Sequence, residues 1–399
     1  MSLESMPNIL FLMTDEHRFD VAGYADDPVV RTPNLDRLAA QGIEFTNAYT
    51  PSPVCVPGRQ CIMAGKLPTS CGFTGWDDLE PGAMTIPRHF SCHAYYTAAC
   101  GKLHHQGSDQ MQGWIHRIGD EMKMSRRYIE GKNKAYFDRY TRPFGVFKWS
   151  DRKEILRAGP GNAFHVKMDE YTVLGAENFI ENFFVSPYYD REKGNHQPLM
   201  LKVSLLQPHY PYICDEELFK YYLNRVEPFS EEELFDHPFL AERALIPGTD
   251  VSARDLRRAT AAYYGMVETT DRHFGRVLKA LETAGQNLDQ WIILYTSDHG
   301  EMLGQHGVWE KQKFFEASVR APLLMSWPAR WPRRKQIDRN VNLTDLFATL
   351  CDAAKLETPA GLDSRSLLPL IEAEDPASIQ WENEVVSMFS KARQPLLPE

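Results

Sequence analysis

The sequence lacks the features that mark several large classes of protein. It contains no internal repeat, heptad array or low-complexity segment, which argues against solenoids, coiled coils and chains that stay disordered. The apolar run at residues 8–14 is too short to span a membrane and too short for the core of a signal peptide. We therefore expect a cytoplasmic protein that has no membrane partner.

Positive charge and paired cysteines are also scarce. The chain has 44 basic and 54 acidic residues and a net charge of −10, which disfavours nucleic acid as a partner. Its seven cysteines are odd in number and show no paired CxxC spacing, so the sequence predicts neither a disulfide framework nor a structural zinc site. A reducing compartment agrees best with this cysteine pattern.

Strand and helix patterns alternate along the 399 residues, of which 43% are hydrophobic. This alternation is typical of a globular α/β protein with a large core. Residues 32–42 predict a helix that begins with a threonine cap hydroxyl and a proline at the first helical position. Residues 252–284 predict a long helix with candidate breaks at Gly265 and Gly275. The predicted strands are residues 9–13, 97–100, 199–206, 291–295 and 321–327.

Reactive side chains follow the first four of these predicted strands. The clusters are residues 14–18, 101–105, 207–209 and 296–300, and each contains at least one histidine. Open α/β sheets bind their ligands at the carboxyl ends of the strands. If the four strands are parallel neighbours, the clusters meet at one edge of the sheet and form a single site.

The side chains near this edge suit a metal-assisted reaction on an anion. Asp15, Asp298 and His299 supply the oxygen and imidazole ligands that suit a divalent cation such as Ca²⁺, Mg²⁺ or Mn²⁺. Positive side chains stabilise the charge that grows on the oxygens of a tetrahedral oxyanion during displacement. The candidates for that role are Arg59, Lys102 and Lys311. The sequence therefore predicts an anionic ester as the substrate.

Residues 51–69 carry the most specific motif in the chain. They contain Cys55-x-Pro57-x-Arg59, and the run Gly-Lys-Leu-Pro-Thr begins six residues after the arginine. This pattern resembles the signature of the sulfatases, a family of the alkaline phosphatase superfamily. The resemblance extends from about residue 8 to about residue 389. The other segments that carry it are residues 8–15, 32–49, 101–104, 207–212, 297–300 and 304–311.

The resemblance implies a fold and a division of the chain into two domains. The expected fold is an α/β three-layer sandwich like that of alkaline phosphatase, with a large mixed, mostly parallel sheet. Residues 1–355 would form the catalytic domain, and residues 356–399 a truncated C-terminal subdomain with one strand at 384–389. This reduced subdomain leaves three alternatives open: a wide pocket, completion by a partner subunit in a homo-oligomer, or a poorly active protein.

The resemblance also implies a modified nucleophile and a metal site. In the family a separate maturation enzyme oxidises the signature cysteine, here Cys55, to formylglycine, whose aldehyde hydrates to a geminal diol. One hydroxyl of this diol would bind one divalent metal ion, Ca²⁺ by preference, together with Asp15, Asp298 and His299. Arg59 would help to hold that hydroxyl as the nucleophile.

The remaining roles follow from the same resemblance. Lys102 and Lys311 would clamp the oxyanion, and His209, alone or with Lys311, would protonate the departing oxygen. His104 would take the proton of the second hydroxyl, so that the covalent adduct collapses to the aldehyde. An unconverted Cys55 has no second hydroxyl and would turn over poorly.

Several positions depart from the common family pattern. Glu16 stands where many sulfatases have a second aspartate, and His299 where some have asparagine, so the site is closest in pattern to choline sulfatases and phosphonate monoester hydrolases. Glu16 is therefore a doubtful metal ligand. Gln60 and Cys61 replace the small residues usual after the signature arginine. The alternates for the lysine and histidine roles are Lys313, His17, His105 and His306.

Three functions remain open from the sequence. The first is hydrolysis of a sulfate ester, and the second is hydrolysis of a phosphonate monoester or a phosphodiester at the same site. The third is a catalytically silent oxyanion-binding protein in which Cys55 is never converted. The organic part of the substrate stays open, although four aromatic side chains could stack on a ring. They are Trp76, Trp114, Trp309 and Tyr210.

Overall fold

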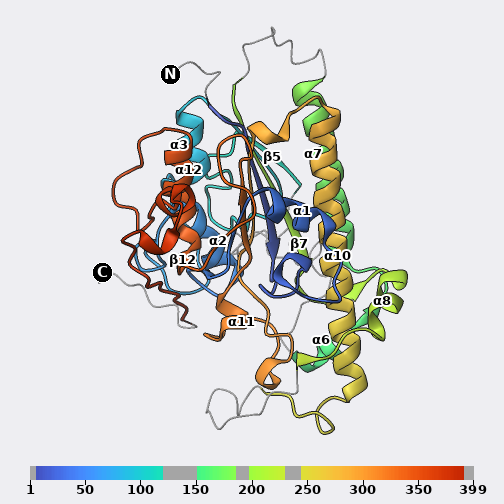
Figure 1. The fold of residues 1–399 in the computed structure, drawn as a ribbon. Helices are drawn as coiled ribbons and strands as arrows, with labels where there is room; N and C mark the ends of the chain where they lie inside the picture. The colour runs from blue at the N-terminus through green and yellow to red at the C-terminus, as the bar shows by residue number, and fades with distance from the viewer. Residues whose placement is uncertain (1–5, 120–150, 186–196, 230–243, 391–399) are drawn as a thin grey trace, which may run out of the picture.

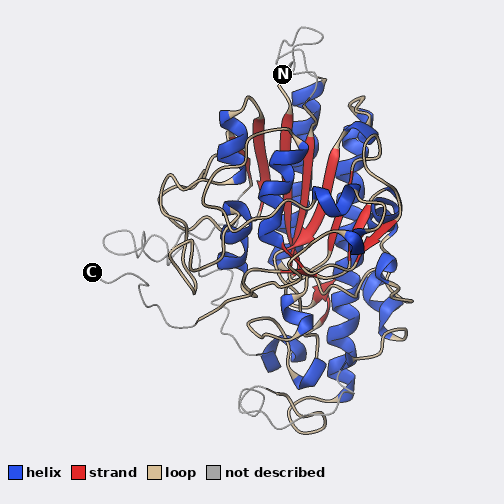
Figure 2. Cartoon of the chain, turned by 60° about the vertical axis from the view of Figure 1, so that its left-hand side comes forward, coloured by secondary structure: helices blue, strands red, loops and turns tan. Residues whose placement is uncertain are grey.

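The computed structural model describes residues 6–119, 151–185, 197–229 and 244–390. An eight-stranded sheet runs through the middle of the molecule (Figures 1 and 2). Five neighbouring strands, in the order β9-β1-β7-β4-β5, pair in parallel, whereas β10 is antiparallel to both of its neighbours. The sheet is mixed and mostly parallel, as predicted. In spatial order its strands are β11 (Lys335–Ile337), β2 (Ile43–Phe45), β10 (Leu323–Ser326), β9 (Ile292–Ser297), β1 (Ile9–Asp15), β7 (Leu199–Pro208), β4 (Tyr96–Gly101) and β5 (His116–Ile118).

Helices cover both faces of the sheet. The side chains of β1 show why, because alternate residues of a strand point to opposite faces. Ile9, Phe11 and Met13 enter one hydrophobic core, and Leu10 and Leu12 enter another. The first core is covered by α2 (Cys55–Ala64), α3 (Ile86–Cys92) and α12 (Leu346–Ala353), and the second by α1 (Pro33–Gln41), α7 (Phe164–Phe184) and α10 (Ala253–Thr283). Figure 1 shows the two helical layers on either side of the sheet, which confirms the three-layer sandwich.

Shorter elements surround this sandwich. Two-stranded pairs join β3 (Ala48–Tyr49) to β12 (Val341–Asn342) and β6 (Gly159–Pro160) to β8 (Ile213–Cys214). The other α-helices within the described ranges are α6 (Asp151–Leu156), α8 (Glu216–Leu223), α11 (Glu316–Val319) and α13 (Leu368–Glu372). Single 3₁₀ turns lie at Gly23–Ala25, Leu288–Gln290, Gln305–Gly307, Leu343–Asp345 and Pro376–Ser378. Within the described ranges no helix combines the length and the hydrophobicity needed to cross a bilayer.

All five predicted strands are present, and the helix predicted at residues 32–42 is α1. The predicted threonine cap is wrong. The Thr32 hydroxyl donates to Asp36 and accepts from the Gly23 backbone N–H, so it does not accept from the helix. The first-turn N–H groups of Asn34 and Leu35 instead donate to the carboxylate of Asp271 on α10. A side chain from a distant helix therefore replaces the local cap.

The helix predicted at residues 252–284 is α10, and neither candidate break occurs. Ser252 and Asp255 form a reciprocal capping box at its start. Gly265 and Gly275 lie where other chain segments approach the helix closely. A Cβ atom would lie 2.6 Å from Cys214 Sγ at the first position and 2.6 Å from Asn34 Nδ2 at the second. These glycines therefore make room for neighbours and do not interrupt the helix.

The strand predicted at residues 384–389 is wrong. The segment is irregular, and its backbone makes isolated hydrogen bonds to loops: the Met388 N–H donates to the Pro51 carbonyl and the Ser390 N–H to the Thr74 carbonyl. The Asn342 side chain donates to the Val386 carbonyl. Among the described residues no neighbouring strand pairs with this segment, so its apolar pattern does not produce a strand.

Residues 356–390 pack on the same core as the rest of the chain. Leu367, Leu370 and Ile371, in and before α13, belong to the cluster that also contains β1 and α12 residues. The last nine residues of the predicted C-terminal subdomain lie outside the described residues. The domain boundary at residue 355 remains a prediction.

Candidate active site

Four parallel strands bring their polar clusters to one edge of the sheet. Asp15 is the last residue of β1, and Asp298, Lys102 and His209 follow directly after β9, β4 and β7. These strands are neighbours in the order β9-β1-β7-β4. Gly101 has a φ of 85°, and a Cβ there would lie 2.2 Å from the Ser204 carbonyl oxygen, so the turn into Lys102 requires glycine. The predicted convergence of the clusters is confirmed.

The amino end of α2 brings the signature cysteine to this edge. Cys55 is the first residue of the helix and is only 2% exposed. The segment before it is tied to β9, because the Thr50 hydroxyl donates to the Asp298 carbonyl oxygen at 2.6 Å. At Gly58 a Cβ atom would lie 2.9 Å from the Ser52 carbonyl oxygen, so glycine permits the tight entry into the helix. Cys55 is therefore held in place by its own helix and by the contact of the preceding segment with Asp298, which follows β9.

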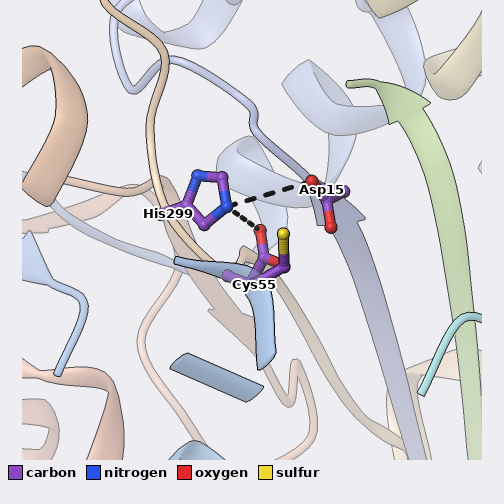
Figure 3. Close-up of side chains that lie close together, drawn as sticks. Asp15, Cys55 and His299 are labelled. Atoms are coloured by element: carbon purple, nitrogen blue, oxygen red, sulfur yellow. Dashed lines mark ion pairs between the residues drawn. The ribbon is translucent and has the colours of Figure 1, made fainter. Parts of the chain in front are cut away.

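Four side chains from three distant segments form a compact ligand set. The ligand atoms of Asp15, Cys55, Asp298 and His299 all lie within 4.8 Å of one another. Figure 3 shows the His299 ring facing Asp15, with Cys55 beside them. His299 Nε2 lies 3.9 Å from Asp15 Oδ1 and 3.6 Å from Asp298 Oδ1.

The ligand atoms of this set are available to bind a cation. Asp15 Oδ1 and His299 Nε2 are buried and have no hydrogen-bond partner in the part of the chain that the structure describes, although such groups are costly to bury without a partner. The Nδ1 atom of His299 lies 2.9 Å from the Gly300 carbonyl oxygen, which orients Nε2 toward the carboxylates. Two carboxylates and one imidazole suit a hard divalent ion, so the residues fit the metal that the sequence predicts.

Arg59 joins the two carboxylates of this set. Its Nε donates to Asp298 Oδ2 at 2.7 Å and its Nη2 to Asp15 Oδ2 at 3.1 Å. Its Nη1 donates to the Lys102 carbonyl and to the Ser204 hydroxyl. Every contact is buried, so Arg59 holds the two aspartates at a set spacing from each other.

Lys102 adds a second cation beside Asp15, with 2.7 Å between its Nζ and Asp15 Oδ2. Burial alone would raise the pKa of Asp15, but the neighbouring cations Lys102 and Arg59 hold this pKa well below its usual range. Burial and Asp15 likewise oppose ionisation of the Cys55 thiol, yet Lys311 and Lys102 lower its pKa. The site therefore stabilises negative charge at position 55.

A third group surrounds Lys311. Its Nζ donates to Glu16 Oε2 at 2.7 Å and lies 2.5 Å from His209 Nε2. His209 Nδ1 donates to the Tyr210 carbonyl oxygen at 2.6 Å, and His209 Nε2 lies 3.8 Å from Asp15 Oδ1. Burial and the neighbouring Lys311 hold the pKa of His209 well below its usual range. His209 is therefore a neutral imidazole that accepts a hydrogen bond from the lysine.

His104 follows β4 and is bound to α2 through its backbone. It has a φ of 57°, and its carbonyl oxygen accepts from Gln60 Nε2 of that helix at 3.0 Å. Its ring packs edge-on against Trp76, whose indole N–H donates to Gln106. The helix that carries Cys55 thus also positions His104, whose role in collapse of the adduct stays a prediction.

The alternates named from the sequence have other partners. Lys313 donates to the Trp309 carbonyl oxygen, and His17 contacts the Tyr295 hydroxyl and the Val21 carbonyl. His105 pairs with the Gln110 carbonyl, and the His306 ring packs on Phe315. Of the four aromatic candidates, Trp114 and Trp309 are buried in the core, and Tyr210 lies against His209 with a ring separation of 4.1 Å. Trp76 is half-buried beside His104.

Three supporting residues were not predicted. Ser204 accepts from Arg59 and is the one hydroxyl within an apolar strand, a signal that was readable in the sequence. The Tyr263 hydroxyl donates to the Glu16 carbonyl, and Glu301 accepts from the backbone N–H groups of Leu303 and Glu310. The contact between Tyr263 and Glu16 joins segments 247 residues apart, and no local pattern indicates it.

Comparison with known proteins gives this geometry a family. A family model described as Sulfatase matches residues 7–356, so the chain belongs to the sulfatase family, whose fold is alkaline-phosphatase-like and whose members are classed as sulfuric ester hydrolases. An arylsulfatase of Clostridium perfringens is 30% identical over 92% of this chain and 78% of its own length. A choline-sulfatase of Rhizobium meliloti is 28% identical over 95% and 74%.

A further curated relative and a solved structure are also similar to this chain. An ulvan-active sulfatase of Formosa agariphila is 27% identical over 93% of this chain, which spans 66% of that protein's length. The crystal structure of a phosphonate monoester hydrolase of Agrobacterium radiobacter has a TM-score of 0.69 at 22% identity, covering 92% of this chain and 77% of that one. This second likeness concerns the fold.

Proposed function

We propose that this protein hydrolyses a sulfate ester, with a formylglycine derived from Cys55 as nucleophile and one divalent metal ion. The observation that carries the proposal is the position of Cys55 at the start of α2, inside a buried ligand set with Asp15, Asp298 and His299. Membership of the sulfatase family and three named sulfatase relatives support it. A maturation enzyme would be the partner that converts Cys55.

The ligand set would hold the ion through Asp15, Asp298, His299 and the modified residue 55. When bound, a divalent ion lowers the pKa of a coordinated hydroxyl and makes it a nucleophile at neutral pH. Ca²⁺ is the proposed ion, with Mg²⁺ or Mn²⁺ as alternatives, because two carboxylates dominate the set. Arg59 fixes the relative positions of Asp15 and Asp298, the two carboxylates that would bind this ion.

The chain's own groups account for the remaining chemistry. Lys102 and Lys311 present buried ammonium groups that would stabilise the oxyanion of the ester. Lys311 and His209 share a hydrogen bond, so a proton can pass from this pair to the departing alcohol oxygen. His104 would remove the proton of the second hydroxyl at residue 55 and so release sulfate.

A phosphonate monoester or phosphodiester is the second candidate substrate. Such an ester carries the same single negative charge as a sulfate ester, and the buried cations Lys102 and Lys311 would bind either. The ratio of kcat/KM values for matched aryl sulfate and aryl phosphonate esters would rank the two. A cytoplasmic location stays our proposal, and it is supported by the finding that all seven cysteines are free.

The decisive experiment measures the state of residue 55 together with turnover. Conversion to formylglycine lowers the mass of the peptide that contains Cys55 by about 18 Da, since aldehyde oxygen replaces the thiol. We expect this mass in protein made with its maturation enzyme, together with release of sulfate from an aryl sulfate. The release should disappear in Cys55→Ala and persist in Cys92→Ala, which removes an exposed cysteine.

A plain cysteine at position 55 under these conditions, without turnover, would contradict the proposal. It would favour the third function, a silent oxyanion-binding protein.

A further inference from the structure

Glu16 follows Asp15 in the chain but stands outside the metal ligand set. Its backbone has a φ of 66°, a left-handed conformation that turns the chain sharply after β1. Its N–H donates to Asp298 Oδ1 at 3.1 Å, and its carbonyl oxygen accepts from the Tyr263 hydroxyl at 2.7 Å. These two hydrogen bonds from separate elements hold the backbone in this turn. The turn directs the Glu16 carboxylate to Lys311, whereas the Asp15 carboxylate contacts Arg59 and Lys102.

The Glu16 carboxylate reaches Lys311. Glu16 Oε2 accepts from Lys311 Nζ at 2.7 Å and lies 3.4 Å from His209 Nε2. The same Nζ lies 2.5 Å from His209 Nε2 and 4.8 Å from the centre of the Tyr210 ring. Glu16 and Lys311 side chains are both fully buried. Two of the three N–H donors of the ammonium are thus directed by Glu16 and His209.

This arrangement argues against a metal at Glu16. Asp15, Glu16 and His209 have ligand atoms close enough together to hold an ion. The Lys311 ammonium, however, already lies within 2.7 Å of two of those three side chains. Lys311 thus takes up His209 Nε2, the ligand nitrogen of this set, and Glu16 Oε2. In the first set Arg59 and Lys102 contact the Oδ2 atoms of the aspartates, so Asp15 Oδ1 and His299 Nε2 stay available to an ion. The cation that Glu16 binds is therefore the lysine.

From these contacts we infer that Glu16 is a positioning residue that orients Lys311 and His209 for protonation of the leaving group, and that it does not bind the catalytic metal. The inference rests on the proposed function for the leaving-group step. Lys311 is buried, and an unpaired ammonium there would lack a compensating charge. Glu16 supplies that charge and fixes the direction of two N–H bonds. His209 donates from Nδ1 to Tyr210, which leaves Nε2 as the acceptor for the lysine.

The first test measures metal binding without catalysis. Calcium is titrated calorimetrically into the converted protein after removal of bound metal, and into Glu16→Gln and His299→Gln. We expect the calcium Kd of Glu16→Gln to stay within about threefold of the parent value, whereas loss of a true ligand in His299→Gln should raise it by more than about tenfold. Equal weakening by both substitutions would overturn the inference.

The second test uses the identity of the leaving group. Aryl sulfates with leaving groups of increasing pKa are compared in the parent protein, Glu16→Gln, Lys311→Met and the double variant. Glu16→Gln should lower kcat, with little change in KM, by about tenfold for good leaving groups and by about a hundredfold or more for poor ones. A uniform loss across the series would indicate a merely structural role and overturn the inference.

The double variant shows whether Glu16 acts through Lys311. In the Lys311→Met background, Glu16→Gln should have little further effect on poor leaving groups, because the group it positions is gone. Additive losses would contradict the inference. If the parent protein releases no sulfate at all, the proposed function fails, and the calcium titration still decides whether Glu16 is a ligand.

Discussion

Arg59 shows at the scale of single residues how the site tolerates so much buried charge. The two aspartates it joins are completely buried, and Lys102 shares Asp15 with it. A buried carboxylate is tolerated when it is paired and hydrogen-bonded and is very costly when it is not. The family signature therefore places Arg59 where it can bind Asp15 and Asp298 at once, one turn of helix after Cys55.

Replacement of Arg59 tests this account. In Arg59→Met the carboxylates of Asp15 and Asp298 lose a shared partner, and we expect the free energy of unfolding to fall by about 3–5 kcal/mol. Urea unfolding, followed by circular dichroism, measures it. Arg59→Lys, which keeps the charge but cannot span both aspartates, should recover part of the loss. Equal stability of Arg59→Met and the parent protein would show that the pairing has no net value.

At the scale of elements, α10 shows why a glycine can be favourable inside a helix. Gly265 would normally weaken a helix relative to alanine by roughly 0.5–1 kcal/mol. Here α10 crosses β8, where Cys214 comes close to the helix backbone. The local cost of glycine is offset by the close packing of two elements.

This packing makes Gly265→Ala an informative substitution. The new methyl group would lie 2.6 Å from Cys214 Sγ and 3.1 Å from its Cβ, so we expect stability to fall by about 1–3 kcal/mol even though alanine favours the helix. Thermal unfolding checks the direction. Adding Cys214→Ala should restore part of the loss by opening space for the methyl group. An increase in melting temperature for Gly265→Ala alone would refute the account.

At the scale of the whole molecule, buried histidines set the response to acid. Burial, the main cause at each of four sites, lowers the pKa to about 4 at His17, His165 and His273 and to about 3 at His105. In the unfolded chain each would titrate near 6.5. The unfolded state therefore binds more protons below pH 6.5, and stability falls as the pH decreases from there toward 4.

We accordingly expect a net loss of stability on mild acidification, which is partly offset by two buried aspartates because burial raises the pKa of Asp169 to about 7 and that of Asp271 to about 6. Each such histidine contributes a slope of up to about 1.4 kcal/mol per pH unit between pH 6.5 and about 4. Urea unfolding at pH 7, 6 and 5 measures the total slope, and His165→Gln should reduce it. His93→Gln, which changes an exposed histidine, serves as the control. A stability that stays constant from pH 7 to 5 would contradict this expectation.

Much of the fold and site was predictable because it depends on local patterns. Apolar runs of strand length are buried on both faces of a parallel sheet, and their ends carry the reactive side chains, so the positions of Asp15, Lys102, His209 and Asp298 at one sheet edge were predictable. Their catalytic roles remain predictions. Other features depend on distant partners. The hydroxyl of Thr32 binds Asp36 and leaves the cap of α1 to Asp271, a residue more than two hundred positions away.

The sequence by itself determined which chemical groups this protein has and at which strand ends they stand, because motif and periodicity are properties of short segments. The tertiary structure alone decided what each group touches. It placed Glu16 on Lys311 and outside the ligand set, left residues 384–389 without a strand partner, and kept α10 continuous through Gly265. Each of these outcomes depends on side chains brought together from distant parts of the chain, where burial and charge pairing outweigh local preference.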